Sequence, residues 1–84
     1  MKLKPYIQSE VLLARRAQQE RFLQLAQLRY ERALILARKD PRQEAFVYYR
    51  LSGFWLRQKA FAQAWTALKQ ANRKVFRSSL KRSD

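Results

Sequence analysis

Apolar residues recur along this chain with the period of α-helices. The segment between Pro5 and Pro41 contains neither Gly nor Pro, and its apolar residues return at steps of three and four, as at Leu23, Ala26, Tyr30, Ala33 and Ala37. This spacing places an apolar face along one side of a helix. The last helical segment, after residue 60, has its own apolar stripe, made by Phe61, Ala64, Trp65, Leu68, Ala71 or Asn72, Val75, Phe76 and Leu80.

The first segment allows two interpretations. From Arg15 to Arg21 only Ala17 is apolar, so either one long helix over about 6–38 has an exposed middle, or the chain reverses near 18–21. Helix-breaking residues are absent there, and this favours the continuous helix. A helix of that length would extend past its neighbours and expose Val11, Leu12 and Leu13 to a second chain, so we expect self-association into a homo-oligomer.

Asp40 and Pro41 mark the next boundary. Asp40 can accept hydrogen bonds from the first amides of a helix, and Pro41 suits the first helical position, where no N–H is needed. We therefore predict a second helix over about 41–57, a turn at 58–60, and a third helix over about 61–79. Residues 80–84 are expected to fray.

Composition supports a helical protein. With one Gly and two Pro among 84 residues, the chain lacks the turn residues that a sheet of several strands needs. We predict one all-α domain over residues 1–84, with three helices, or four if the first segment reverses.

Residues 48–71 resemble one tetratricopeptide repeat, a helix–turn–helix hairpin with small residues where the helices cross. The positions that carry the resemblance are Tyr48, Leu51, Ser52, Trp55, Phe61, Ala64, Leu68 and Ala71. A weaker echo lies 38 residues earlier, at 13–34, an offset that exceeds the family's 34 by four.

The resemblance implies a TPR-like helical hairpin that serves as a binding scaffold. It implies a groove lined by the first helix of the hairpin, and the residues that it places there are Tyr49, Arg50, Ser52, Gly53 and Leu56. Arg50 and Arg57 partly echo the paired basic residues with which this family clamps a peptide carboxylate. Gly53 is predicted to allow close helix packing, in preference to a kink or a ligand approach.

The residue types for catalysis are missing. There is no Cys and no His, and the six carboxylates are scattered without a pair at helical spacing. General acid–base work usually needs His or paired carboxylates, so we predict no enzyme, no metal site and no cofactor. No apolar run reaches the ~20 residues of a membrane span, and no secretory signal is present, so a cytoplasmic location without membrane insertion is expected.

Positive charge is the second strong feature. Nineteen Lys and Arg against six acids give a net charge of +13. The third helix carries a basic strip, which we define as Lys69, Arg73, Lys74, Arg77 and Lys81. Like charges four residues apart repel on a helix, so the strip favours an anionic partner. Further arginines, at 15, 16, 21, 29 and 32, are spread along the first segment.

Two functions follow from these features. The first is a small basic protein-interaction module that docks on a larger protein, through an acidic or helical segment of that partner, and regulates or tethers it. Its predicted partner-binding residues are Tyr49, Arg50, Gly53 and Arg57. The alternative is an RNA-binding or ribosome-associated protein, which the charge and the basic strip would support.

Overall fold

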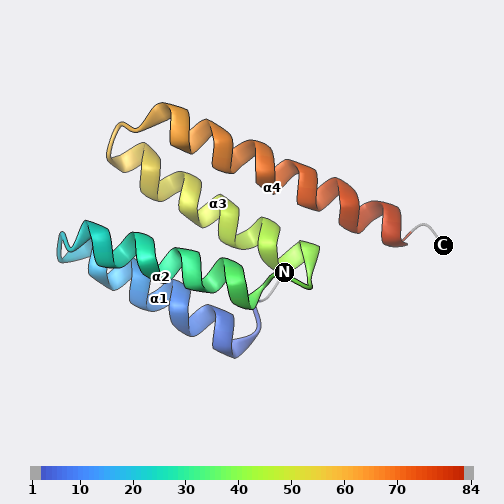
Figure 1. The fold of residues 1–84 in the computed structure, drawn as a ribbon, viewed down its shortest axis with the longest axis horizontal. Helices are drawn as coiled ribbons and strands as arrows, with labels where there is room; N and C mark the ends of the chain where they lie inside the picture. Colours follow the sequence, from blue (N-terminus) through green and yellow to red (C-terminus); the bar gives the residue numbers. More distant parts are fainter. Residues whose placement is uncertain (1–2, 83–84) are drawn as a thin grey trace.

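Four helices make up the part of the chain that the computed structural model describes, residues 3–82, with side chains described through Arg77. They are α1 (Pro5–Gln19), α2 (Leu23–Leu36), α3 (Pro41–Arg57) and α4 (Phe61–Arg82). Between residues 3 and 82 there is no β-strand, which confirms the all-α class. The helices form two antiparallel hairpins, α1 with α2 and α3 with α4, and α3 lies between α2 and α4 (Figure 1).

The prediction of one continuous helix over 6–38 is wrong. The chain reverses at Glu20–Phe22, and Arg21 adopts a left-handed conformation with φ 65°. The Phe22 amide donates to the Ala17 carbonyl (2.8 Å) and the Arg21 amide to the Gln18 carbonyl (3.1 Å). These two bonds form a Schellman motif, which satisfies the last carbonyls of α1 without a Gly.

The first hairpin closes because its facing residues are small. Ala14 and Ala17 of α1 and Ala26 and Ala33 of α2 are all buried, so the two backbones can approach closely. The partly buried ion pair between Glu10 and Arg29 (3.3 Å) joins the same two helices. Burial of these alanine faces offsets the cost of a left-handed Arg21, about 1–2 kcal/mol.

The second hairpin turns in the same way 38 residues later. Lys59 has φ 60°, its amide donates to the Leu56 carbonyl (2.9 Å), and the Ala60 amide donates to the Trp55 carbonyl (3.0 Å). Each of these atoms lies 38 positions after its counterpart in the first turn. The two hairpins therefore correspond at an offset of 38, in backbone geometry as well as in spacing.

Local signals explain where α3 begins. The Asp40 carboxylate accepts from the amides of Arg42 (3.1 Å) and Gln43 (3.4 Å), and Pro41 occupies the first turn. The buried Gln43 side chain accepts from the Lys4 amide (2.9 Å) and so ties the start of α1 to α3.

The last helix is longer than predicted. Helix α4 continues to Arg82, so residues 80–82 are helical where fraying was expected, and residues 83–84 lie outside the described part.

The core lies where the two hairpins meet. Its largest fully buried side chains are Ile7, Tyr30, Val47 and Phe54, and the rings of Tyr30 and Phe54 are 5.4 Å apart. Val11 belongs to this core as well. Of the residues expected to overhang, Val11 is therefore buried, because the reversal at Arg21 folds α2 back along α1, whereas Leu12 and Leu13 are exposed.

Candidate partner-binding site between the hairpins

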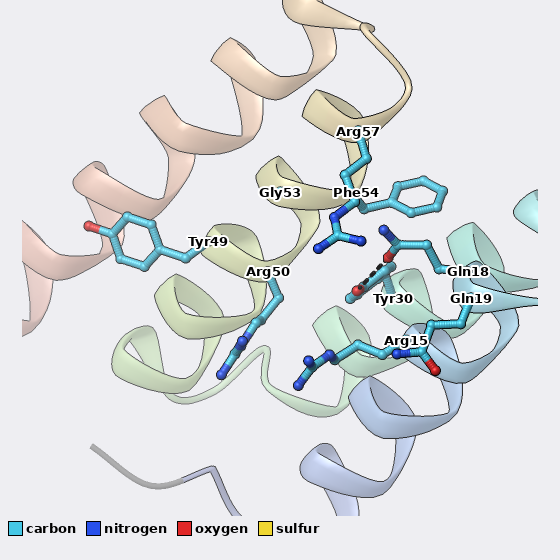
Figure 2. Close-up of a pocket in the computed structure, with 9 residues that line it drawn as sticks. All are labelled: Arg15, Gln18, Gln19, Tyr30, Tyr49, Arg50, Gly53, Phe54 and Arg57. Carbon is cyan, nitrogen blue, oxygen red and sulfur yellow. Dashed lines mark hydrogen bonds between the residues drawn. The ribbon is translucent and has the colours of Figure 1, made fainter.

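A hollow of ≈ 210 Å³ opens between the two hairpins. We call it the arginine hollow, because three of its lining residues are arginines. It contains the four residues predicted to bind a partner and five others, which together are Arg15, Gln18, Gln19, Tyr30, Tyr49, Arg50, Gly53, Phe54 and Arg57 (Figure 2). The structure thus brings α1, α2 and α3 together around one concave surface.

Helix α3 presents its part of the hollow by helical spacing. Arg50, Gly53 and Arg57 recur at steps of three and four, so they share one side of α3. The guanidinium of Arg50 lies over the ring of Phe46, 5.3 Å from its centroid, and this cation–π contact holds the side chain along the helix. Arg15 comes from α1 and reaches the same space (Figure 2).

The hollow is electropositive. Burial raises the pKa of the Tyr30 hydroxyl, while the charges of Arg15, Arg50 and Arg57 act in the opposite direction and favour the phenolate. The Tyr30 hydroxyl donates to Gln18 Oε1 (3.4 Å). No carboxylate is among the lining residues. Such a site can hold a carboxylate or a phosphate, because guanidinium groups bind both through paired hydrogen bonds.

The acidic side chains nearest in sequence are engaged elsewhere. Among the described residues Glu10 pairs with Arg29, Glu20 with Arg16, and Glu44 with Lys74, as ion pairs of 3.3–3.6 Å. The arginines of the hollow have no ion pair with any carboxylate in the described part of the chain. Their charge is therefore available to a partner.

Gly53 does not serve close helix packing, so that prediction is wrong. A Cβ atom built on Gly53 would meet nothing within 4 Å, because the residue faces the open hollow. The neighbouring Ser52 is buried instead, and it donates its hydroxyl to the Tyr49 carbonyl (2.7 Å). The missing side chain of Gly53 enlarges the hollow.

Tyr49 lies at the edge of the hollow. Its ring points away from the arginines and toward α4 (Figure 2), and its hydroxyl donates to Asn72 Oδ1 (3.0 Å). Its ring remains partly exposed. Tyr49 thus connects the arginine hollow to the surface of α4.

The basic strip does not contribute to the hollow. Lys69, Arg73 and Arg77 are exposed on α4, whereas Lys74 turns toward α3, where its Nζ lies 3.5 Å from Glu44 Oε1. The side chain of Lys81 lies outside the described residues. The two sets of predicted site residues therefore form separate surfaces.

Sequence reasoning missed the contribution of α1 and α2. Gln18, Gln19 and Tyr30 carry no motif, and Arg15 was only one of several scattered arginines. A continuous first helix would have kept Arg15 and Tyr30 more than 20 Å apart, since each residue adds 1.5 Å along a helix, or about 22 Å in all. Recognition of the turn at Arg21 was the one signal that could have placed them together.

No family model, curated protein or solved structure matches this chain. Within residues 3–82 no helix is both long and apolar enough to cross a bilayer.

Proposed function

We propose that this chain is a small protein-interaction module that docks on a larger protein through the arginine hollow, and so regulates or tethers that partner. The observation that carries the proposal is the convergence of Arg15, Arg50 and Arg57 around a concave site without a lining carboxylate. The spacing of residues 48–71 supports it, since these residues resemble tetratricopeptide hairpins, which serve as binding scaffolds.

The hollow suits an acidic peptide segment. Three cations held close together repel one another, and a carboxylate placed among them removes that repulsion. Arg and Tyr are also the residue types that contribute most at binding hot spots, since they combine a large contact area with directed hydrogen bonds. The Tyr49 ring, which is directed toward α4, would contact the segment only where it leaves the hollow.

The test compares charge reversal inside and outside the hollow. The probe is a fluorescein-labelled peptide rich in Asp and Glu, and its binding is followed by fluorescence anisotropy at physiological salt. Arg50→Glu with Arg57→Glu should weaken binding by roughly tenfold, because both arginines are exposed and each exposed charge pair contributes only about 0.2–1 kcal/mol. Arg38→Glu with Arg42→Glu is the matched control, which changes the net charge equally on exposed residues outside the hollow.

Equal losses for the two variants would contradict the proposal, because they would show attraction by net charge alone. The Gly53→Leu variant adds a test of shape without a change of charge. It should fill the open space above Gly53 and block the peptide, while circular dichroism shows an intact helix.

RNA binding is the second candidate, and the exposure of Lys69, Arg73 and Arg77 favours it. A single-stranded RNA should then bind with an affinity that falls steeply with salt, with a slope of about −0.7 per phosphate contact. Arg73→Glu with Arg77→Glu should reduce that slope, whereas the variants of the hollow should not. Capture of partners from a nuclease-treated lysate separates the candidates, since protein partners survive digestion and RNA bridges do not.

A further inference from the structure

Helix α4 has two apolar faces, and the structure covers only one. Toward α3 it buries Ala64, Ala67 and Ala71. A neighbouring face, which we call the α4 stripe, consists of Phe61, Trp65, Leu68, Val75 and Phe76. Its three aromatic residues are among the most exposed large hydrophobic residues described, with Phe61 at 64%, Trp65 at 62% and Phe76 at 64%.

The correspondence between the two hairpins allows the α4 stripe to be compared with the equivalent positions of α2, some of which are covered by α3. On α2, 38 residues earlier, Tyr30 and Ala37 stand at the positions of Leu68 and Val75. Both are buried, and the Tyr30 ring packs against Phe54 of α3. On α4, Val75 is 42% exposed where Ala37 is 1% exposed. Leu68 and Val75 thus mark the part of α4 on which a helix in the position of α3 would pack. The three aromatic residues of the stripe correspond to Leu23, Gln27 and Arg38, which are exposed on α2, so a helix that also covers these rings must contact a wider face of α4.

A second copy of this chain does not supply that helix. Helix α3 contacts the core through Val47, Leu51 and Phe54. At the corresponding positions α1 presents Ser9, Leu13 and Arg16, all exposed, and two of them are polar. The exposed side of α1 therefore cannot pack on α4 of another molecule as α3 packs on α2.

The charges beside the stripe define the partner further. Lys69, Arg73 and Arg77 recur every four residues along the adjacent side of α4, without a carboxylate in ion-pair distance in the described part. Two α4 helices packed together would bring six such cations close to one another, on molecules of +13 each. A helix with acidic residues along one edge would instead neutralise them.

We infer that the α4 stripe is the docking site for an acidic amphipathic helix of a partner protein, which takes on α4 the position that α3 has on α2 and extends over the aromatic rings beside Leu68 and Val75. Its apolar residues follow the spacing i, i+4, i+7 of Val47, Leu51 and Phe54. Its acidic residues lie beside Lys69 and Arg73. This surface is separate from the arginine hollow, and binding here does not depend on the function proposed for the hollow.

The probe is a synthetic helical peptide with Leu and Phe at i, i+4 and i+7 and Glu on its polar face. One comparison peptide has the same composition in scrambled order, and another has Lys in place of Glu. We expect the acidic amphipathic peptide to bind at least ~10-fold more tightly than either. Its binding should also shift the emission of Trp65 to shorter wavelength, since the ring leaves water.

Two double variants locate the site. Trp65→Gln with Phe76→Gln should weaken binding by ~10-fold or more, since aromatic anchors carry most of the energy of such contacts. Leu28→Gln with Ile35→Gln is the control, since it removes equally exposed apolar residues from α2 and should change binding by less than ~2-fold. Arg50→Glu with Arg57→Glu should leave the affinity of this peptide unchanged, which separates this site from the hollow.

Several results would overturn the inference. Equal binding of the scrambled peptide would show attraction without helical recognition, and equal loss in the α2 control would place the site elsewhere. A dimer of the free chain that the Trp65 and Phe76 substitutions dissociate would identify a second copy as the occupant. A shift of Trp65 emission on phosphatidylserine vesicles but not with the peptide would identify a membrane surface.

Discussion

Gly53 shows how a single position can serve a site at a cost to the helix. Gly within a helix is less favourable than Ala by ~1 kcal/mol. The residue has a helical, negative φ, and a Cβ would meet no atom within 4 Å, so nothing in the fold requires Gly here. The space that it leaves is part of the arginine hollow.

Gly53→Ala should therefore stabilise the chain. We expect the free energy of unfolding in urea to rise by about 0.5–1 kcal/mol, because Ala restricts the unfolded chain and favours the helix. Ser52→Leu, at the nearly buried neighbouring position, is the contrasting variant and should destabilise through overpacking. A loss of stability in Gly53→Ala would mean that the space above Gly53 is filled in solution.

Tyr30 gives the fold a dependence on alkaline pH. Burial raises its pKa above the value of 10.0 of an unfolded tyrosine, despite the opposing effect of three arginines. The neutral phenol is thus favoured in the folded state. Its contribution to stability is complete below about pH 10 and is lost as the pH rises through the folded pKa.

Tyr30→Phe should remove part of this dependence. At pH 7 it loses the weak bond to Gln18 and should cost about 0.5–1.5 kcal/mol. Between pH 9 and pH 11 its stability should fall less than that of the parent chain, as measured by urea unfolding. Tyr6→Phe, at an exposed tyrosine, serves as the control and should follow the parent. Parallel curves for all three chains would rule out Tyr30 as the group responsible.

At the scale of the elements, the first helix of each hairpin ends in a Schellman motif whose left-handed position is occupied by a residue with a Cβ atom. Arg21 and Lys59 are the only non-Gly residues with positive φ in the described part. A left-handed residue with a Cβ costs roughly 1–2 kcal/mol, and only Gly adopts this conformation freely. The turns form because the paired helices bury their facing sides.

Lys59→Gly should stabilise the second hairpin. We expect a gain of up to about 1 kcal/mol, since relief of the backbone strain is partly cancelled by the greater freedom of Gly in the unfolded chain. Lys39→Gly is the matched control, because Lys39 is exposed and has no positive φ, and it should be neutral or destabilising. A destabilised Lys59→Gly chain would show that this turn does not have the left-handed conformation in solution. The stability of Lys59→Gly and of Lys39→Gly is measured by thermal unfolding followed by circular dichroism.

At the scale of the whole molecule, the chain carries more positive charge than its carboxylates can neutralise, and it exposes large apolar side chains that the fold does not bury. The net charge is +13, and the described carboxylates pair with only a few of the cations. Repulsion among like charges destabilises a compact chain and is screened by salt, with a Debye length of about 10 Å at 0.1 M. We therefore expect the molecule to be more stable at higher ionic strength.

Raising the ionic strength from about 0.02 M to about 0.2 M should increase Tm by several degrees, because such screening is effective over the distances between surface cations. Arg73→Glu with Arg77→Glu lowers the net charge from +13 to +9, since each reversal removes two charges. Its Tm should be higher at low salt and should change less with salt. A Tm that falls with ionic strength in the parent chain would show that ion pairs outweigh repulsion.

Several features follow from the residues alone. The shortage of Gly and Pro excludes a sheet of several strands, the pair Asp40–Pro41 begins a helix, and the excess of Lys and Arg requires a basic surface. Each depends on local chemistry: the propensity of a residue, the bonds that a cap accepts, or a charge that persists in any fold. The 38-residue spacing of small residues can likewise be read from the sequence, because it requires no knowledge of which segments pack together.

The reversal at Arg21 and the arginine hollow were decided by the tertiary structure. No residue at 18–21 favours a turn by itself, and the turn forms because Ala14 and Ala17 pack against Ala26 and Ala33. The same packing brings Arg15 to Arg50 and Arg57. Periodicity also showed an apolar stripe on the last helix, but not which part of it α3 covers. A helical pattern specifies which residues share a face, whereas the choice of neighbour depends on contacts between segments far apart in the sequence.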